Sequence, residues 1–155
     1  MNIRRAVPAD IPALSALLRQ VEQVHHLGRP DLFRSGGVKY TPEELAEILA
    51  DEGRPVFVAD TEEGVKGYAF CLFKQRLHDT CVTDIRTLYI DDLCVDEACR
   101  GQHIGQALYG FVRQYAKECG CYNITLNVWC CNPSAMRFYE KCGLVPQKIG
   151  MESIL

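Results

Sequence analysis

The spacing of apolar residues changes along this chain from a helical period to alternation and back, and these changes predict its elements. Residues 11–24 carry apolar side chains on one helical face, with Asp10 in position to cap the helix. Residues 41–49 begin with TPEE, a capping box with proline at the first helical position, which predicts a second helix. Residues 25–40 have no steady period and contain adjacent glycines, so we expect a loop there.

The middle of the chain alternates apolar and polar positions and predicts strands. Residues 55–60 and 65–73 are rich in β-branched and aromatic side chains around the turn TEEG, which predicts a hairpin. A loop should follow over residues 75–83. Residues 86–95 predict a further strand, interrupted by two adjacent aspartates.

The remaining residues predict helix, strand and helix, followed by an extended tail. A central helix should end near Gly120. Its inner face should consist of Ile104, Leu108, Phe111, Val112 and Tyr115. Residues 122–129 predict a strand, and a short helix should run from Asn132 to about Cys142. We expect one or two short strands in the tail, residues 144–155.

This order of elements predicts an α/β fold in a single domain over residues 1–155. The sheet should be mixed, antiparallel in its early part and with a later parallel pair joined by the central helix. The sequence contains no internal repeat, low-complexity tract or linker, and its length is sufficient to bury a sizeable core.

Charge and composition exclude some partners. The net charge of -3 argues against general affinity for nucleic acid or for an anionic membrane, both of which need excess lysine and arginine. No apolar run approaches the roughly 20 residues of a membrane span. The first residues contain neither an uninterrupted apolar stretch nor a small-residue cleavage site, so we expect no signal peptide and a cytoplasmic location.

The chain has nine cysteines, and their pattern indicates a reducing compartment rather than a metal site. Their number is odd, and several lie in apolar runs, where a free cysteine behaves as a small hydrophobic residue. No Cys-x-x-Cys pair is present, and the other spacings do not fit zinc ligands. We therefore expect reduced thiols in a reducing compartment and no metal site.

The turn between the strand at 86–95 and the central helix is a candidate for chemistry. Residues 99–108 read CRGQHIGQAL, with an arginine and two glycines at the start of a helix. A helix N-terminus leaves N–H groups unpaired and binds anions readily, and glycine lets the backbone close around phosphate oxygens. The segment matches neither the dinucleotide motif nor the P-loop. From this turn alone, a phosphate site and a plain tight turn remain alternatives.

A second motif favours the phosphate site. Residues 126–144 read LNVWCCNPSAMRFYEKCGL, and residues 89–108 read YIDDLCVDEACRGQHIGQAL. Together they resemble the GNAT superfamily of acetyl-CoA-dependent N-acetyltransferases, whose signatures are Q/R-x-x-G-x-G/A and N-x-x-A-x-x-F-Y-x-x-x-G-F. The resemblance is strongest over residues 88–144. It implies a GNAT-like single domain with a mixed, mostly antiparallel twisted sheet, a central parallel strand pair splayed around the cofactor, and about four flanking helices.

The resemblance also implies a binding site for acetyl-CoA. The pantetheine arm would lie between the splayed strands, and an exposed backbone amide would polarise the thioester carbonyl. The implied cofactor-binding residues are Leu93, Cys94 and Val95 on the strand, Arg100, Gly101, Gln102, His103, Ile104, Gly105 and Gln106 in the loop, and Asn132, Ser134 and Tyr139 at the following helix. His103 stands where the family has the first glycine of the loop.

Two proton transfers follow from the implied reaction, because the amine must lose a proton and the leaving thiolate must gain one. Tyr139 occupies the family's general-acid position. Asp91 occupies the position where some members, polyamine acetyltransferases among them, carry a glutamate base. Asp92 is the fallback, since alternation points it to the opposite sheet face. Some protein-acetylating members carry a catalytic glutamate on the next strand, where this chain has Asn127.

The implied activity is transfer of the acetyl group from acetyl-CoA to a primary amine of a small molecule or peptide, by direct attack in a ternary complex. The alternatives are a non-catalytic acyl-CoA-binding regulatory module, an interaction protein with a coincidental turn, and a covalent route through Cys94. The two aspartates favour a cationic acceptor such as a polyamine, aminoglycoside, lysine or peptide N-terminus. We expect no nucleic-acid or membrane partner, and a homodimer stays open. In this family the loop that borders the acceptor pocket would contain Arg29, Asp31, Phe33 and Tyr40.

Overall fold

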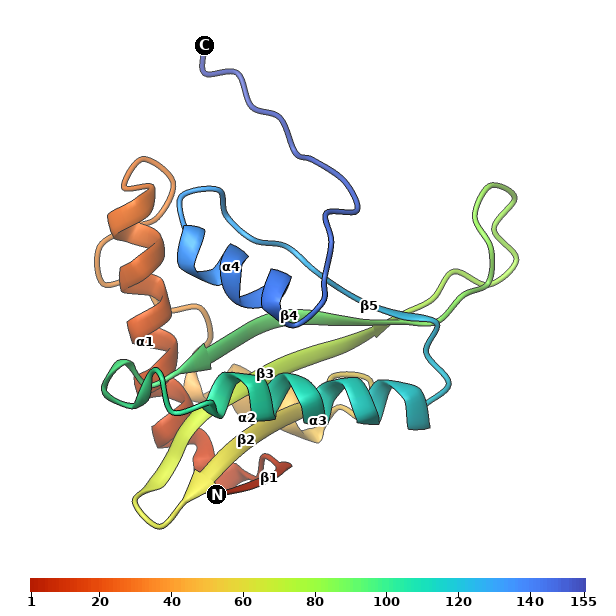
Figure 1. Cartoon of the computed structure of the whole chain (residues 1–155). Coiled ribbons are helices and arrows are strands. Elements are labelled where there is room, and N and C mark those ends of the chain that lie inside the picture. The colour runs from red at the N-terminus through yellow and green to blue at the C-terminus, as the bar shows by residue number, and fades with distance from the viewer.

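The computed structural model describes residues 1–155 and consists of a five-stranded sheet with helices on both faces (Figure 1). The strands are β1 (Asn2–Arg5), β2 (Val56–Thr61), β3 (Gly64–Lys74), β4 (Thr87–Val95) and β5 (Asn123–Leu126). The helices are α1 (Ile11–Gly28), α2 (Pro42–Ala50), α3 (Ile104–Glu118) and α4 (Pro133–Lys141), with short 3-10 turns at Pro8–Asp10 and Glu97–Cys99. None of the helices is both long and apolar enough to span a bilayer.

The strands lie in the order β1-β2-β3-β4-β5. Neighbours from β1 to β4 pair antiparallel, and β4 pairs parallel with β5 because α3 makes the crossover between them. The predicted α/β class, the mixed sheet and its parallel pair are therefore confirmed. No strand follows β5, so β5 forms one edge of the sheet.

The two faces of the sheet bury two sets of apolar side chains. On one face, α1 and α2 pack against alternate residues of the strands; the buried residues there are Ala6, Leu14, Leu17, Leu18, Leu45, Ile48, Val56, Val58, Tyr68, Phe70 and Cys94. On the other face, α3 packs against the residues in between, which include Phe57, Ala69, Cys71, Leu88, Ile90, Tyr109, Val112 and Ala116. This division follows from the two-residue period of a strand, which sends neighbouring side chains to opposite faces.

The predicted capping box of α2 is present. The Thr41 N–H donates to Glu44 Oε2 at 2.7 Å, and the Glu44 N–H donates to Thr41 Oγ1 at 3.2 Å. Asp10 is the N-cap residue of α1, as predicted, but its side chain makes no capping hydrogen bond to this helix. The buried carboxylate of Asp10 instead accepts hydrogen bonds from the Arg4 guanidinium and from the Val7 N–H, because a cation and an unpaired amide lie within its reach.

One strand was not predicted, and two further expectations are corrected. Residues 2–5 form the strand β1, which the pattern NIRR did not predict because only its pairing with β2 supports it. Phe111 lies at the rim of the α3 interface and is 37% exposed, while Tyr109 and Ala116 enter the core. The tail forms no strand, since no strand of this chain lies beside it.

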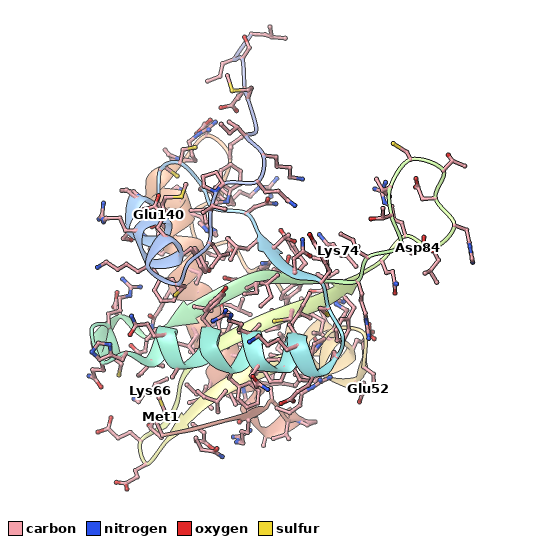
Figure 2. The ribbon with its side chains drawn as sticks, turned by 45° about the vertical axis from the view of Figure 1, so that its right-hand side comes forward. Met1, Glu52, Lys66, Lys74, Asp84 and Glu140 are labelled. Carbon is pink, nitrogen blue, oxygen red and sulfur yellow. The ribbon has the colours of Figure 1, made fainter.

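The predicted loop at residues 75–83 is confirmed and extends to residue 86, because β4 begins at Thr87. It begins after Lys74 and projects from the body near Asp84, at the end of the molecule opposite the turn between β4 and α3 (Figures 1 and 2). This loop is therefore remote from the segment that carries the candidate phosphate site.

Gly67 controls how closely α3 packs against the sheet. A Cβ at this position would lie 2.8 Å from the Cys94 carbonyl oxygen and 3.0 Å from Leu108 Cδ1. We expect Gly67→Ala to lower the free energy of unfolding by about 1–3 kcal/mol, the usual cost of overpacking. Urea denaturation measures this change. Gly110→Ala in the exposed middle of α3, where a Cβ meets nothing within 4 Å, should instead raise the stability by about 0.5–1 kcal/mol.

Candidate active site

A β-bulge interrupts β4 at its two aspartates. On β3, Phe70 faces Asp92 and the residue after Phe70 faces Ile90, so Asp91 has no partner on β3. An extra residue of this kind bends a strand and increases its twist. The ladder between β4 and β5 also ends at Ile90. Residues 91–95 therefore present one backbone edge that has no neighbouring strand.

The bulge also turns both aspartates to the same face of the sheet. Ahead of the bulge, Leu88 packs in the core on the α3 side, and beyond it Leu93 does so while Cys94 packs on the α1 side. The phase of the alternation changes at Asp91, so Asp91 and Asp92 both face α1. The expectation that they point to opposite faces is wrong, because it assumed an uninterrupted strand.

Lys39 lies between the two carboxylates. Its Nζ is 3.0 Å from Asp91 Oδ2 and 3.5 Å from Asp92 Oδ2. The Tyr40 hydroxyl donates to Asp91 Oδ2 at 2.9 Å, and the Tyr68 hydroxyl donates to Asp92 Oδ2 at 3.1 Å. We call these five residues the aspartate cluster. Its two carboxylates and one ammonium leave it with a negative charge when all three groups are ionised.

Burial sets the proton affinities in the aspartate cluster. The Asp92 side chain is only 9% exposed, and burial raises its pKa although Lys39 and Tyr68 act in the opposite direction. Burial lowers the pKa of Lys39, but the charges of Asp92 and Asp91 outweigh it, so that this pKa is raised overall. Lys39 is therefore held as an ammonium at neutral pH.

Unpaired amides line the turn into α3. The backbone N–H groups of residues 101–106 donate to no acceptor of the chain. Gly101 has φ of 82° and His103 has φ of 63°, so the turn passes through the left-handed region where glycine is favoured. This explains the glycine of the family pattern at the position of His103. The imidazole of His103 is turned toward its own helix, with Nδ1 2.7 Å from Gln106 Oε1. Such a run of free amides at a helix N-terminus suits a phosphate.

Gly105 joins this turn to the neighbouring elements. A Cβ there would lie 3.2 Å from the Phe138 ring and 3.5 Å from the Val95 side chain. The absence of a side chain thus lets the first turn of α3 pack directly against α4 and the end of β4. The two sequence motifs are in contact through this glycine.

At the start of α4, the predicted cofactor ligands Asn132 and Ser134 have a local role. Asn132 Oδ1 accepts the Ala135 N–H at 3.1 Å and the Ser134 hydroxyl at 2.9 Å, which caps the helix. Farther along α4, the Tyr139 hydroxyl makes no hydrogen bond within the chain, and burial together with the charge of Asp92 raises its pKa. Tyr139 therefore stays protonated at neutral pH.

These elements line one cleft with a volume of about 2380 Å³. The predicted residues that line it are Asp91, Asp92, Leu93, Cys94, Val95, Arg100, Gly101, Ile104, Asn132, Ser134 and Tyr139. The other predicted loop residues, Gln102, His103, Gly105 and Gln106, do not line it. The fold thus brings the candidate acid and both candidate bases into the same cleft as the start of the amide-rich turn.

The loop before α2 borders the cleft as well. The Phe33 ring packs between His25 and Trp129, with centroid distances of 4.9 and 5.2 Å. Arg29 Nη2 lies 2.7 Å from Asp31 Oδ2, so these two loop residues pair with each other. Asn127 follows directly after β5, and its exposed side chain donates a hydrogen bond to the Tyr89 hydroxyl at 3.1 Å.

Two members of the aspartate cluster, Lys39 and Tyr68, were not predicted from the sequence. Lys39 belongs to no motif. Tyr68 lies in an apolar strand, where its sequence context predicts a core residue. The covalent alternative through Cys94 loses support. The thiol is buried against α1, with Sγ 3.8 Å from the Leu17 carbonyl oxygen, and burial raises its pKa to about 12.

Comparison with known proteins places these features in a family. Residues 21–144 match the sequence profile of the acetyltransferase (GNAT) family. The chain belongs to this family. It is 33% identical to glucosamine 6-phosphate N-acetyltransferase 1 of Oryza sativa subsp. japonica, over 43% of this chain and 38% of that protein, so this chain matches well under half of the rice protein. It is 26% identical to thialysine N-epsilon-acetyltransferase of Bos taurus, over 91% of this chain and 82% of that protein.

A solved structure resembles this chain over its whole length. The crystal structure of a mutant of the BH1408 protein from Bacillus halodurans is 31% identical and has a TM-score of 0.96. The match covers 100% of this chain and 99% of that one. The similarity therefore extends over all elements of the sheet and over the segments that connect them.

Removing the ammonium from the aspartate cluster should destabilise the protein in a pH-dependent manner. We expect Lys39→Met to lower the free energy of unfolding at neutral pH by about 1–3 kcal/mol, less than the loss for a fully buried pair. The pKa of Asp92 is raised, so protons bind the folded state more tightly than the unfolded state. Without Lys39 this pKa rises further, and the deficit should shrink as the pH falls toward it.

Urea denaturation of both proteins over a pH series measures this effect. Lys66→Met is the matched control, because Lys66 pairs at 3.6 Å with a Glu63 side chain that is 82% exposed. Its loss should stay under about 1 kcal/mol and show no such trend. A Lys39→Met deficit that stays constant or grows in acid would contradict the assigned charges.

Proposed function

We propose that this protein transfers the acetyl group of acetyl-CoA to a primary amine, by direct attack of the amine in a ternary complex. Membership of the GNAT family supports acetyl transfer in general. The observation that carries the proposal for this chain is the single cleft. It joins an amide-rich turn, an unpaired strand edge, a protonated tyrosine and a pair of carboxylates.

The residues of the cleft fit acetyl-CoA. The free N–H groups of the turn, of which those of Gly101 and Ile104 lie at the cleft, and the side chain of Arg100 would bind its phosphates. The unpaired backbone edge of Leu93, Cys94 and Val95 would hydrogen-bond its pantetheine arm as a neighbouring strand does. When bound, acetyl-CoA supplies an acetyl group activated as a thioester. Backbone amides of this edge are fixed in the sheet, so they are preorganised to stabilise negative charge on an oxygen beside them.

Asp91 is the base of this proposal. It is more exposed than Asp92, with a side-chain exposure of 28% against 9%, and the bulge directs it into the cleft. An amine with a pKa near 10 is almost entirely ammonium at neutral pH, so its proton must pass to a base or through water to a base. Tyr40 and Lys39 orient the carboxylate for this step through the contacts given above.

Tyr139 is the acid of this proposal. Its raised pKa keeps the hydroxyl proton at neutral pH, and the hydroxyl has no other acceptor within the chain. A phenol in this condition can give its proton to a thiolate that leaves beside it. The charge of Asp92 contributes to the raised pKa, so the aspartate cluster keeps the proton on Tyr139 but also makes the phenol a weaker acid.

The aspartate cluster favours a cationic acceptor. The ammonium of Lys39 lies 3.0 Å from Asp91 Oδ2, so the carboxylates already bind one primary ammonium of the chain. With one ammonium for two carboxylates, the cluster would attract a further cation and repel a phosphate. Two related enzymes are named after their acceptors, thialysine and glucosamine 6-phosphate. The amine of thialysine suits the negative charge of the cluster better than the phosphate of glucosamine 6-phosphate does. We therefore propose a lysine-like amine or a polyamine as acceptor.

Loss of the Tyr139 hydroxyl should slow the reaction without weakening cofactor binding. We expect Tyr139→Phe to lower kcat by about 10²-fold or more, because general acid catalysis contributes about 10²–10⁴. The Kd for coenzyme A, measured by isothermal titration calorimetry, should change by less than about 2-fold. Tyr115→Phe on α3, whose ring packs on Phe57 outside the cleft, is the control and should retain full activity. Unchanged kcat in Tyr139→Phe would remove the acid from the proposal.

An amine panel tests both the activity and the acceptor. Formation of the acetylated amine is followed by mass spectrometry, because the exposed free cysteines Cys81, Cys130 and Cys131 would react with thiol reagents. We expect diamines, polyamines and lysine analogues to be acetylated in preference to glucosamine 6-phosphate, and Asp91→Asn to lower kcat/KM for them by about 10²-fold.

The outcomes of this panel are distinct. Preference for glucosamine 6-phosphate would overturn the cationic acceptor but keep the acetyl transfer. Binding of coenzyme A without acetylation of any amine would favour the non-catalytic acyl-CoA-binding module. Absence of coenzyme A binding would overturn the proposed cofactor site itself.

A further inference from the structure

One lysine of the chain lies where the proposed reaction needs the amine of the acceptor. The side chain of Lys39 is 26% exposed and lines the cleft, and its Nζ lies 3.0 Å from Oδ2 of Asp91, the proposed base. Lys74, Lys117 and Lys148 also line the cleft, but none of them forms an ion pair with a carboxylate. Lys39 is therefore the one amine of the chain that lies both in the cleft and beside the base.

The fold fixes the position of Lys39. The next residue but one, Thr41, closes the capping box of α2. The Tyr40 ring packs with its centroid 5.7 Å from that of Phe70, and its hydroxyl donates to Asp91 Oδ2. Lys39 Nζ itself lies 5.5 Å from the centroid of the Tyr40 ring, within the range of a cation–π contact. The amine is thus held beside the base by neighbours that belong to α2 and to the sheet.

The proposed acid lies near the same carboxylates. Asp92 Oδ2 is 3.5 Å from Lys39 Nζ. Burial lowers the pKa of Lys39, and the charge of Asp92 helps to raise it overall. Burial raises the pKa of Tyr139, and the charge of Asp92 raises it further. One carboxylate therefore acts on both groups, so that the amine, the base and the acid surround Asp92 in one cleft.

We propose that Lys39 is an internal acceptor, which the protein acetylates when acetyl-CoA is bound and no other amine occupies the cleft. This inference rests on the proposed acetyl transfer. Lys39 Nζ gives a proton to Asp91 and attacks the thioester carbonyl carbon. The attack breaks the C–S bond, and Tyr139 gives its proton to the leaving thiolate. The nitrogen loses two protons in all. One replaces the proton given by Tyr139 and the other leaves to water, so the products are acetylated Lys39 and coenzyme A.

Two features of Lys39 act on the rate in opposite directions. Its fixed position beside the base makes the attack intramolecular, which favours it over the attack of an amine from solution. Its two carboxylate partners hold it as an ammonium, so only a small fraction is a free amine at neutral pH. The acetylation of Lys39 is therefore slower than the turnover of a good acceptor but faster than the acetylation of an exposed lysine that has no base beside it.

Acetylation of Lys39 stops the reaction. It removes the ammonium that pairs with both carboxylates, although the Asp92 side chain is only 9% exposed and needs a partner. The added acetyl group also stays beside Asp91, in the space that the amine of the acceptor requires. An amine that occupies this space first protects Lys39. The activity of the protein thus depends on a supply of acceptor.

Peptide mass spectrometry of the full chain after incubation with acetyl-CoA tests the proposal. Without an added amine, we expect one acetyl group on Lys39, formed about 10-fold or more faster than on the exposed Lys117 and Lys141. The rate constant should not depend on the protein concentration, because the amine and the base belong to one chain. Lys74 is the matched control, since it lines the cleft without a carboxylate partner and should react no faster than the exposed lysines.

Two variants separate this reaction from chemical acetylation. Asp91→Asn should slow the acetylation of Lys39 by about 10-fold or more and leave that of Lys117 unchanged. Incubation with acetyl-CoA should remove the activity of the unmodified chain at the rate at which Lys39 gains its acetyl group. Lys39→Arg keeps the positive charge but has no primary amine, so the same incubation should leave its own initial activity unchanged.

Each outcome decides the proposal. An unmodified Lys39 in a protein that acetylates an added amine overturns the internal acceptor and keeps the proposed function. Acetylated Lys39 without acetylation of any added amine keeps the internal acceptor and overturns the proposed substrate. Equal rates at Lys39 and Lys74, or an unchanged rate in Asp91→Asn, show chemical acetylation only and overturn the proposal. A rate constant that rises with the protein concentration overturns it as well, because the transfer then runs between two copies.

Discussion

One residue of β4, Asp91, has no partner on β3, and the ladder with β5 stops immediately before it at Ile90. This extra residue lets the two parallel strands diverge, and the divergence leaves the backbone of residues 91–95 free along one edge. The same extra residue shifts the phase of the strand, so that both aspartates face α1. The cofactor edge and the carboxylates of the proposed base thus have one structural origin. A regular strand in the same place would close the gap against β5 and send one carboxylate to the opposite face.

The partners of the two carboxylates in the site come from segments outside the two signature motifs. Lys39 comes from the loop before α2, and Tyr68 comes from the middle of β3, yet both hold the carboxylates of β4. A carboxylate buried to the extent of Asp92 needs such partners, because an unpaired charge in this position would be costly. The site therefore depends on three segments that are far apart along the chain. This arrangement also ties the proposed acid to the base, since the charge of Asp92 helps to keep Tyr139 protonated.

The sequence by itself determined the element order, the α/β class and the two signature motifs. These depend on local signals such as the capping box at Thr41 and the glycines after Arg100, whose effect reaches only a few residues. It did not predict β1, whose strand exists only through pairing with β2, or the state of the tail, which depends on what lies beside it. Both candidate bases were named from the motif, but the face they share was decided by a bulge that only the register against β3 reveals. The contact of Lys39 with these carboxylates was decided by the tertiary structure alone, because a single lysine in a loop carries no periodic or motif signal. The strength of an ion pair depends on the distance between the charges in space and not on their separation along the chain.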